Sequence, residues 1–265
     1  MRRLDIVGLG IGAGSSFSAD IWQRLQAADL VFSMLMPDRG ALSALKTPYL
    51  DLHAQHAPTT PPHIVYRSII DQVLDESRSW KRAALVATGN PLLFNFPVRQ
   101  IMERARRAGW SVDCLPATSS IDAVIVDLEL DVAADGLQIF DTYQILPPGL
   151  PINPGLGCLL LQVASLLDGR GYADNSPRSP EVFGPLRDHL LELYSESHPF
   201  FVVRARSSPE ESSEIMLTSI GDFPRFAGRI DNNCSAYIPP RRQLRGPSSH
   251  QPQAGSVFQG VDPNG

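Results

Sequence analysis

Three histidines and a tyrosine fall within one short stretch, and their side chains have the chemistry of proton transfer. His53, His56 and His63 lie before or at the start of a predicted helix, and Tyr66 lies in its first turns. A histidine titrates near neutral pH and can act as a base, and a tyrosine hydroxyl can donate a hydrogen bond to a developing negative charge. The same pattern also fits solvated loop histidines and a tyrosine that packs on the helix. His53, His56 and Tyr66 are the candidate catalytic residues.

Three predicted strand ends carry loops that suit a small ligand. The first reads Gly8-Leu9-Gly10-Ile11-Gly12-Ala13-Gly14, whose glycines allow close approach of the backbone to a ligand. The second runs from Thr88 to Phe94 and contains Gly89-Asn90-Pro91, and the third runs from Leu115 to Ala123. Each loop alone also fits an ordinary turn or, for Ser119 and Ser120, a helix cap. Because ligands of open α/β sheets bind beyond the carboxyl ends of strands, we expect the loops to share one rim.

The order of these loops resembles the tetrapyrrole-methylase superfamily. Its members carry a glycine-rich first turn, then a G-D-P-type loop, then a P-G-x-S-S-type loop. Here the second loop has Asn90 for the usual Asp, and the third has Ala117 for the usual Gly. The resemblance implies an S-adenosylmethionine-dependent methyltransferase, which releases S-adenosylhomocysteine. It also implies an α/β fold of two α/β domains with the cofactor cleft between them, and a homodimer.

Within that superfamily the chain is most similar to the borosin peptide-backbone N-methyltransferases, over about residues 4 to 225. The matching stretches are Asp51-Leu52-His53 with Tyr66, the Gly89-Asn90-Pro91…Phe94 loop, the third loop, and Asn153-Pro154 leading into Gln162. The resemblance implies a role in making modified ribosomal peptides. It also implies a set of cofactor contacts: Gly10, Thr88, Gly89, Asn90, Leu93, Phe94, Ser119, Ser120 and Gln162.

The sequence leaves several hypotheses for the methyl acceptor. The borosin enzymes have an arginine where this chain has Pro62, and His53 and His56 replace two of their tyrosines. The leading hypothesis is N-methylation of a peptide amide in trans, or of a small molecule with an amide or amine. A carbon methyltransferase of a tetrapyrrole is a second possibility, although the stretch from His53 to Tyr66 holds no Lys or Arg to bind carboxylates. A third is a catalytically inactive cofactor-binding homologue.

Alternating strand and helix patterns predict a mostly parallel sheet in an N-terminal domain of residues 1–148. A proline-rich linker near Pro147 precedes a second α/β domain over 149–240, in which a helix from Glu181 carries an apolar side. Residues 241–265 are rich in Pro, Gly, Ser and Gln, and we expect them to be disordered.

Composition disfavours several classes of function. The net charge is −5, and no Lys/Arg stripe with interleaved aromatics indicates nucleic-acid binding. No apolar run reaches the roughly 18–20 residues of a membrane span. Three scattered cysteines suit neither a disulfide framework nor a metal site and fit a reducing cytosol, so we expect a cytoplasmic protein without metal.

Overall fold

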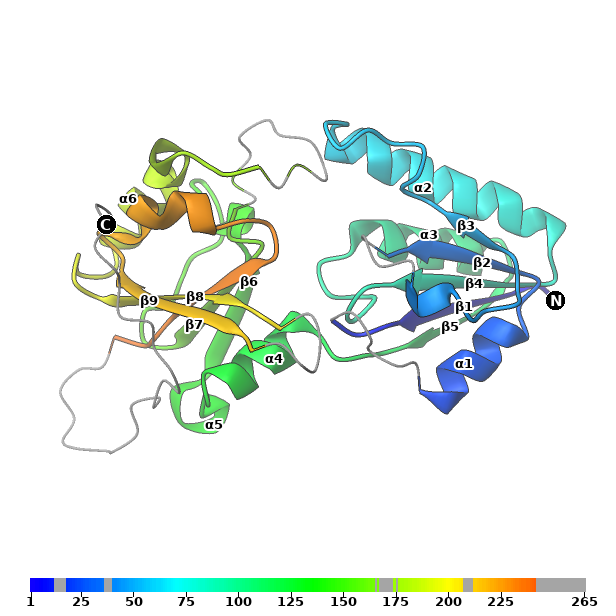
Figure 1. The fold of residues 1–265 in the computed structure, drawn as a ribbon, viewed down its shortest axis with the longest axis horizontal. Coiled ribbons are helices and arrows are strands. Elements are labelled where there is room, and N and C mark those ends of the chain that lie inside the picture. The colour runs from blue at the N-terminus through cyan, green and yellow to red at the C-terminus, as the bar shows by residue number, and fades with distance from the viewer. Residues whose placement is uncertain are drawn as a thin grey trace. The chain divides into compact units, whose positions relative to one another are not determined.

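The computed structural model describes residues 1–11, 18–35, 40–164, 166, 174, 176–206 and 212–241. The chain divides into two compact units, with the second beginning at Ile121. Each unit has a five-stranded sheet (Figure 1).

All strands of the first sheet run parallel, in the order β3-β2-β4-β1-β5. They are β1 (Arg3–Gly8), β2 (Leu30–Met34), β3 (Tyr49–Asp51), β4 (Arg82–Ala87) and β5 (Ser111–Leu115). The central strands β1 and β4 are runs of buried residues, because helices cover both faces of the sheet. Their carboxyl ends consequently lie together at one edge.

Helices α1 (Ala19–Gln26), α2 (Pro62–Glu76) and α3 (Phe96–Arg107) cover this sheet. Figure 1 shows α1 on one face and α2 with α3 on the other. Helix α2 begins with a proline, whose missing N–H costs nothing at the first helical position. It buries Val65, Ile69 and Val73 in the core shared with α3. Ile64, in the first turn of the helix, is 49% exposed.

The second sheet is mixed and has the order β6-β7-β10-β8-β9. Its strands are β6 (Leu137–Asp141), β7 (Gly157–Leu161), β8 (Pro199–Arg204), β9 (Glu214–Ser219) and β10 (Cys234–Ile238). Only β6 and β7 pair in parallel, and the remaining pairs are antiparallel. The helices from residue 120 onward are α4 (Ser120–Asp127), α5 (Val132–Asp135) and α6 (Gly184–Leu191). Short 3-10 helices lie at Gly40–Leu42, Ser77–Ser79, Thr142–Ile145, Pro180–Phe183 and Phe223–Arg229.

The predicted fold of two α/β domains is confirmed, but the division falls earlier than after residue 148. The reason is that β6 pairs with β7 over its whole length, which draws residues 121–148 into the second unit. The helix predicted from Glu181 packs its apolar side into the core of the second unit. Phe183, Leu186 and Leu190 are buried in the core of that unit. The predicted disordered tail lies, from residue 242 on, outside the described residues.

Candidate functional site

The three predicted ligand loops converge at the carboxyl edge of the first sheet, around Gly8. A Cβ atom on Gly8 would lie 2.3 Å from the carbonyl oxygen of Gly89 and 2.8 Å from the Cβ of Ala117. No side chain fits in that space, so only glycine allows the end of β1 to touch both neighbouring loops. The loops after β1, β4 and β5 therefore meet directly around Gly8, as the sheet order β4-β1-β5 requires.

A short bridge joins the first loop to the second. The Gly89 amide donates a hydrogen bond to the Gly10 carbonyl at 2.7 Å, and the two residues form an isolated antiparallel bridge. Both have positive φ angles, 88° at Gly10 and 65° at Gly89, which glycine adopts without strain. Gly12 and Gly14, also part of the predicted turn, lie outside the described residues.

The second loop is shaped by Asn90. Its Oδ1 accepts the Leu92 amide at 3.0 Å, and its carbonyl accepts the Leu93 amide at 3.1 Å. Asparagine makes this turn as well as aspartate does, so the departure from the family pattern leaves the loop intact. The loop ends at Phe94, whose φ of 47° is uncommon for a residue with a side chain. Thr88, at its start, is exposed.

The third loop lies against the second. The Thr118 carbonyl oxygen and the Ser119 Cα lie 3.9 Å and 4.0 Å from the position that a Cβ on Gly89 would take. Ser119 is only 6% exposed, and Ser120 is the first residue of α4. Asp122 lies in the first turn of α4, where an acidic side chain favours the helix dipole.

The predicted catalytic histidines lie at the same edge of the sheet, after β3. The Leu52 amide donates to the Ser33 carbonyl at 3.0 Å, the His53 amide to Asp51 Oδ1 at 2.9 Å, and the His56 amide to the His53 carbonyl at 3.0 Å. The turn therefore continues directly from the sheet. Since β2 alone separates β3 from β4, the two strands are about 10 Å apart.

The two histidines differ from solvated loop residues. Burial lowers the pKa of His53 below its ordinary value, although a hydrogen bond with the Met34 backbone and the charge of Asp51 act in the opposite direction. His53 is therefore neutral at pH 7 and can accept a proton. The Nε2 atom of His56 is buried and has no hydrogen-bond partner within the part of the chain that the structure describes. An unpaired buried ring nitrogen suits contact with a ligand. His63 is exposed.

Tyr66 is half-buried on α2 and borders the second loop through Phe96. Their ring centroids are 6.4 Å apart, and Phe96 is the first residue of α3, two residues after Phe94. Phe96 is 55% exposed, which leaves an aromatic surface beside the loop. The structure thus gathers the histidines, Tyr66 and the three loops of the first unit along one edge of its sheet.

Gln162 belongs to the second unit. It follows β7 directly and has a φ of 52°, a strained conformation for glutamine. Its neighbour Leu161 pairs with Asp141 at the end of β6. The predicted contact between Gln162 and a cofactor stays a prediction.

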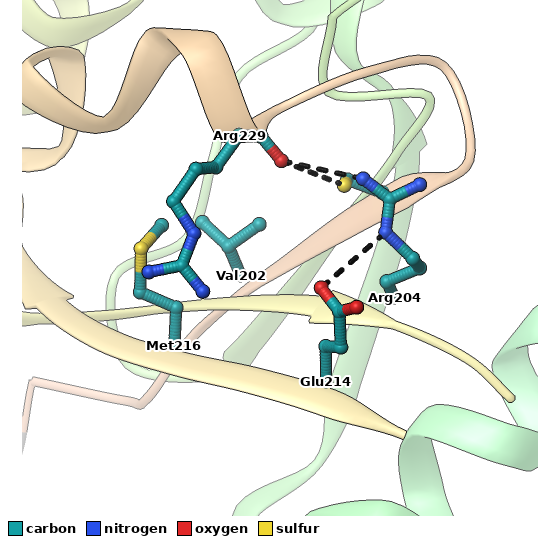
Figure 2. A pocket seen from close by; sticks show the side chains of 6 residues that line it. Val202, Arg204, Glu214, Met216 and Arg229 are labelled. Atoms are coloured by element: carbon teal, nitrogen blue, oxygen red, sulfur yellow. Dashed lines mark hydrogen bonds and ion pairs between the residues drawn. The ribbon is translucent and has the colours of Figure 1, made fainter. Parts of the chain in front are cut away.

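Two hollows in the described residues lie away from these loops. Figure 2 shows one in the second unit, a cavity of about 20 Å³ where Arg204 contacts Glu214 and the Arg229 carbonyl. It has room for about one water molecule. The other lies at the amino ends of β1 and β4, where Arg3 and Arg24 bind the buried Asp5. In both places charged side chains pair with one another.

Comparison with known proteins decides the family. The model of the Tetrapyrrole (Corrin/Porphyrin) Methylases matches residues 3–221. The chain belongs to this family. The predicted family is thus confirmed, and the predicted enzyme class, an S-adenosylmethionine-dependent methyltransferase, is that of the family.

Individual tetrapyrrole methylases share the fold at low sequence identity. A uroporphyrin-III-C-methyltransferase from Thermus thermophilus has a TM-score of 0.64 and 18% identity, covering 90% of this chain and 92% of its own. A cobalt precorrin-4 methyltransferase has a TM-score of 0.63 and 17% identity, covering 89% of this chain and 94% of its own. At these identities the likeness concerns the fold.

Similar curated proteins are borosin precursors fused to a methyltransferase. A type I precursor from Gymnopilus junonius is 24% identical over 74% of this chain and 46% of its own length. A type II precursor from Phlebiopsis gigantea is 24% identical over 89% of this chain and 43% of its own length. The chain spans about half the length of these relatives.

The described residues of this tetrapyrrole methylase contain no cluster of three or more His, Cys, Asp or Glu side chains that could hold a metal ion. Nor does any helix among them combine the length and apolar character needed to cross a membrane. Two residues of interest were not predicted. Phe96 is the first residue of α3, and Asp141 is the last residue of β6, a strand that the sequence pattern does not predict.

Proposed function

We propose that this chain is an S-adenosylmethionine-dependent methyltransferase that methylates nitrogen, either in the amide of a peptide supplied in trans or in a small molecule with an amide or amine. The observation that carries the proposal is the convergence of three family loops around Gly8, beside His53, His56 and Tyr66. The borosin relatives, named as methyltransferases and peptide precursors, support the class of acceptor.

The loops fit the cofactor because their glycines carry no side chain that would keep a ligand from the backbone. Gly89 has only Ile11 Cγ2, the Thr118 oxygen and Ser119 Cα within 4 Å of its missing Cβ, none closer than 3.6 Å. A ligand can therefore approach the Gly89 backbone closely. A similar solved structure, the methyltransferase from Thermus thermophilus, is complexed with S-adenosylhomocysteine, at a TM-score of 0.61 and 15% identity. We infer that Gly10, Gly89, Asn90, Phe94 and Ser119 contact the methyl donor here.

The bound donor supplies an electrophilic methyl group on a sulfonium. An amide nitrogen is a poor nucleophile, so the protein must remove its proton and stabilise the charge that develops on the amide oxygen. His53 is neutral at pH 7 because burial lowers its pKa, and it can take that proton. His56 Nε2 and the Tyr66 hydroxyl can orient the acceptor and donate to its oxygen. The N–H bond and the S–CH₃ bond of the donor break, the N–CH₃ bond forms, the S–CH₃ electron pair stays on the sulfur of adenosylhomocysteine, and a proton is released.

The absence of Lys and Arg between His53 and Tyr66 argues against a tetrapyrrole as the acceptor. A tetrapyrrole precursor carries several carboxylates, which basic side chains would bind. A neutral amide needs none, so the uncharged surface of histidine and aromatic side chains suits a peptide better.

The test is to incubate the protein with adenosylmethionine labelled in its methyl group and an extract of its own cells. The products are then hydrolysed and separated. We expect adenosylhomocysteine to form and N-methyl amino acids to carry the label. Label in a carboxylate-rich tetrapyrrole would contradict nitrogen as the acceptor. Binding of the donor without any adenosylhomocysteine would identify an inactive homologue.

A further inference from the structure

The turn that carries His53 and His56 is joined to helix α2 by a side chain between the two histidines. Gln55 is exposed, yet its Nε2 atom donates to Ser68 Oγ at 3.3 Å and to Gln72 Oε1 at 2.8 Å. Both partners lie on α2, 13 and 17 residues further along the chain. The chemistry described so far gives Gln55 no role.

The start of the same turn is held by the sheet. Leu52 is buried in the core, and its amide donates to the Ser33 carbonyl at 3.0 Å, so the chain is fixed where it leaves β3. His56 lies further on. Its amide donates to the His53 carbonyl at 3.0 Å, a hydrogen bond within the turn itself. The contacts of Gln55 with α2 tie this later part of the turn to the rest of the first unit.

Helix α2 also carries Tyr66, the third candidate catalytic residue. Ser68 follows Tyr66 by two residues, a rise of about 3 Å along the helix axis. The hydrogen bonds of Gln55 therefore join the histidine turn to the element that positions Tyr66, close to that residue.

These two hydrogen bonds should contribute little to the stability of the fold. A hydrogen bond between accessible side chains replaces bonds that both groups make with water, and ordering a glutamine side chain costs conformational entropy. The rate of a reaction is more sensitive to geometry, because a displacement of about 1 Å can lower it about 10²-fold. Loss of the contacts should consequently affect turnover more than folding.

We propose that Gln55 is a positioning residue, which holds the turn of His53 and His56 against α2 in the arrangement with Tyr66 that methyl transfer requires. This inference rests on the proposed function, because it assigns Gln55 a part in that reaction. Gln55 acts through the histidine turn rather than by contact with the donor or the acceptor.

Variants of the full chain at both ends of the shorter hydrogen bond test the inference. Gln55→Ala and Gln72→Leu remove this bond, whereas Gln72→Glu keeps an acceptor for the Gln55 amide. The initial rate of adenosylhomocysteine release is measured with adenosylmethionine and the cell extract as the source of acceptor. We expect Gln55→Ala and Gln72→Leu to be about 10- to 100-fold slower, and Gln72→Glu to keep the parental rate. The double variant should be no slower than the slower single variant, because both substitutions remove one contact.

Two further readouts separate positioning from a loss of structure. Calorimetric titration with adenosylhomocysteine should give parental affinity in every variant, because the loops around Gly8 are untouched. Amide hydrogen exchange at His56 should be faster in Gln55→Ala than in the parent, since the turn loses its tie to α2. The matched control is Gln26→Ala on α1, where the glutamine is exposed, and it should keep the parental rate.

Circular dichroism checks that each variant is folded, and Gln55→Ser replaces Gln55→Ala if that one is not. A parental rate in Gln55→Ala overturns the inference, as do a loss of rate that Gln72→Glu shares with Gln72→Leu and losses that add in the double variant. In each case the parent still releases adenosylhomocysteine, so the proposed function stands. A parent chain that releases none refutes the proposed function, and the inference fails with it.

Discussion

At the scale of single residues, burial sets the protonation state of His53, which lies two residues after the end of β3. His53 is neutral because its surroundings disfavour the charged form, and His56 directs a buried nitrogen with no partner among the described residues. The nearby His63 is exposed on α2. Three histidines that look alike in the sequence therefore divide into two with a proposed role and one without.

His56→Ala and Tyr66→Phe should lose methyl transfer while they keep the fold. A positioned acid–base or hydrogen-bonding group contributes about 10²–10⁴-fold in rate. The affinity for adenosylhomocysteine and the melting temperature should stay close to those of the parent, and His63→Ala is the matched control that should change neither rate nor affinity. Release of adenosylhomocysteine measures the rate. If both variants methylate at the parental rate, the active site lies elsewhere.

Asp141 should make stability depend on pH. Its folded-state pKa of about 6 lies above the ordinary value of 3.8, so the ionised form destabilises the fold above pH 6, and protonation relieves this as the pH falls toward 4. The parent should gain about 2–3 kcal/mol relative to Asp141→Asn between pH 8 and pH 4. Urea unfolding of both proteins at the two pH values measures this difference. A difference that does not change with pH would show that Asp141 is not a buried acid.

At the scale of elements, one glycine holds the ligand loops together. Gly8→Ala would place a Cβ 2.3 Å from the Gly89 carbonyl oxygen, so the loops after β1 and β4 must separate. We expect a loss of about 1–3 kcal/mol in the free energy of unfolding and a large loss of adenosylhomocysteine affinity.

Gly228→Ala is the control for this substitution, because a Cβ there would meet nothing within 4 Å. It should leave both stability and affinity near the parental values. Denaturant unfolding and calorimetry measure the two quantities. Parental affinity in Gly8→Ala would contradict the view that the convergence of the loops forms the binding site.

Sequence patterns predict the elements of the first unit better than those of the second, for a physical reason. Buried parallel strands such as Ala83–Ala87 are continuous apolar runs, and the Pro62 start of α2 is a strong helix signal. Strand β10 mixes polar and apolar residues in Cys234–Ile238 and is a strand because β7 and β8 flank it. The sequence pattern of these residues therefore predicts no strand. Strand β6 likewise depends on its pairing with β7, so the sequence pattern predicts neither this strand nor the position of Asp141 at its end.

The candidate site also has parts that the sequence predicts and parts that depend on how the elements pack. Spacing of Gly8, Gly10 and Gly89 predicts the loops, since each glycine has a local reason to be there. That Gly8 is the point where the loops touch follows only from the order β4-β1-β5. Burial of His53 and the pairing of Tyr66 with Phe96 likewise depend on how strands and helices pack.

At the scale of the whole molecule, the family resemblance alone supports a homodimer. Phe183, Leu186 and Leu190 are buried in the core of the second unit, so the apolar side of the helix near Glu181 gives no separate argument for an interface. We still expect light scattering to give twice the chain mass of 29.0 kDa at micromolar concentration. A single-chain mass over that range would contradict the prediction.

Binding of the cofactor product is the most direct measurement of the central claim, that the loops around Gly8 hold an adenosyl methyl donor. Calorimetric titration of the full chain with S-adenosylhomocysteine should show saturable binding in the micromolar range, with Gly8→Ala weaker and Gly228→Ala unchanged. No heat of binding with the parent chain at millimolar ligand would contradict the account.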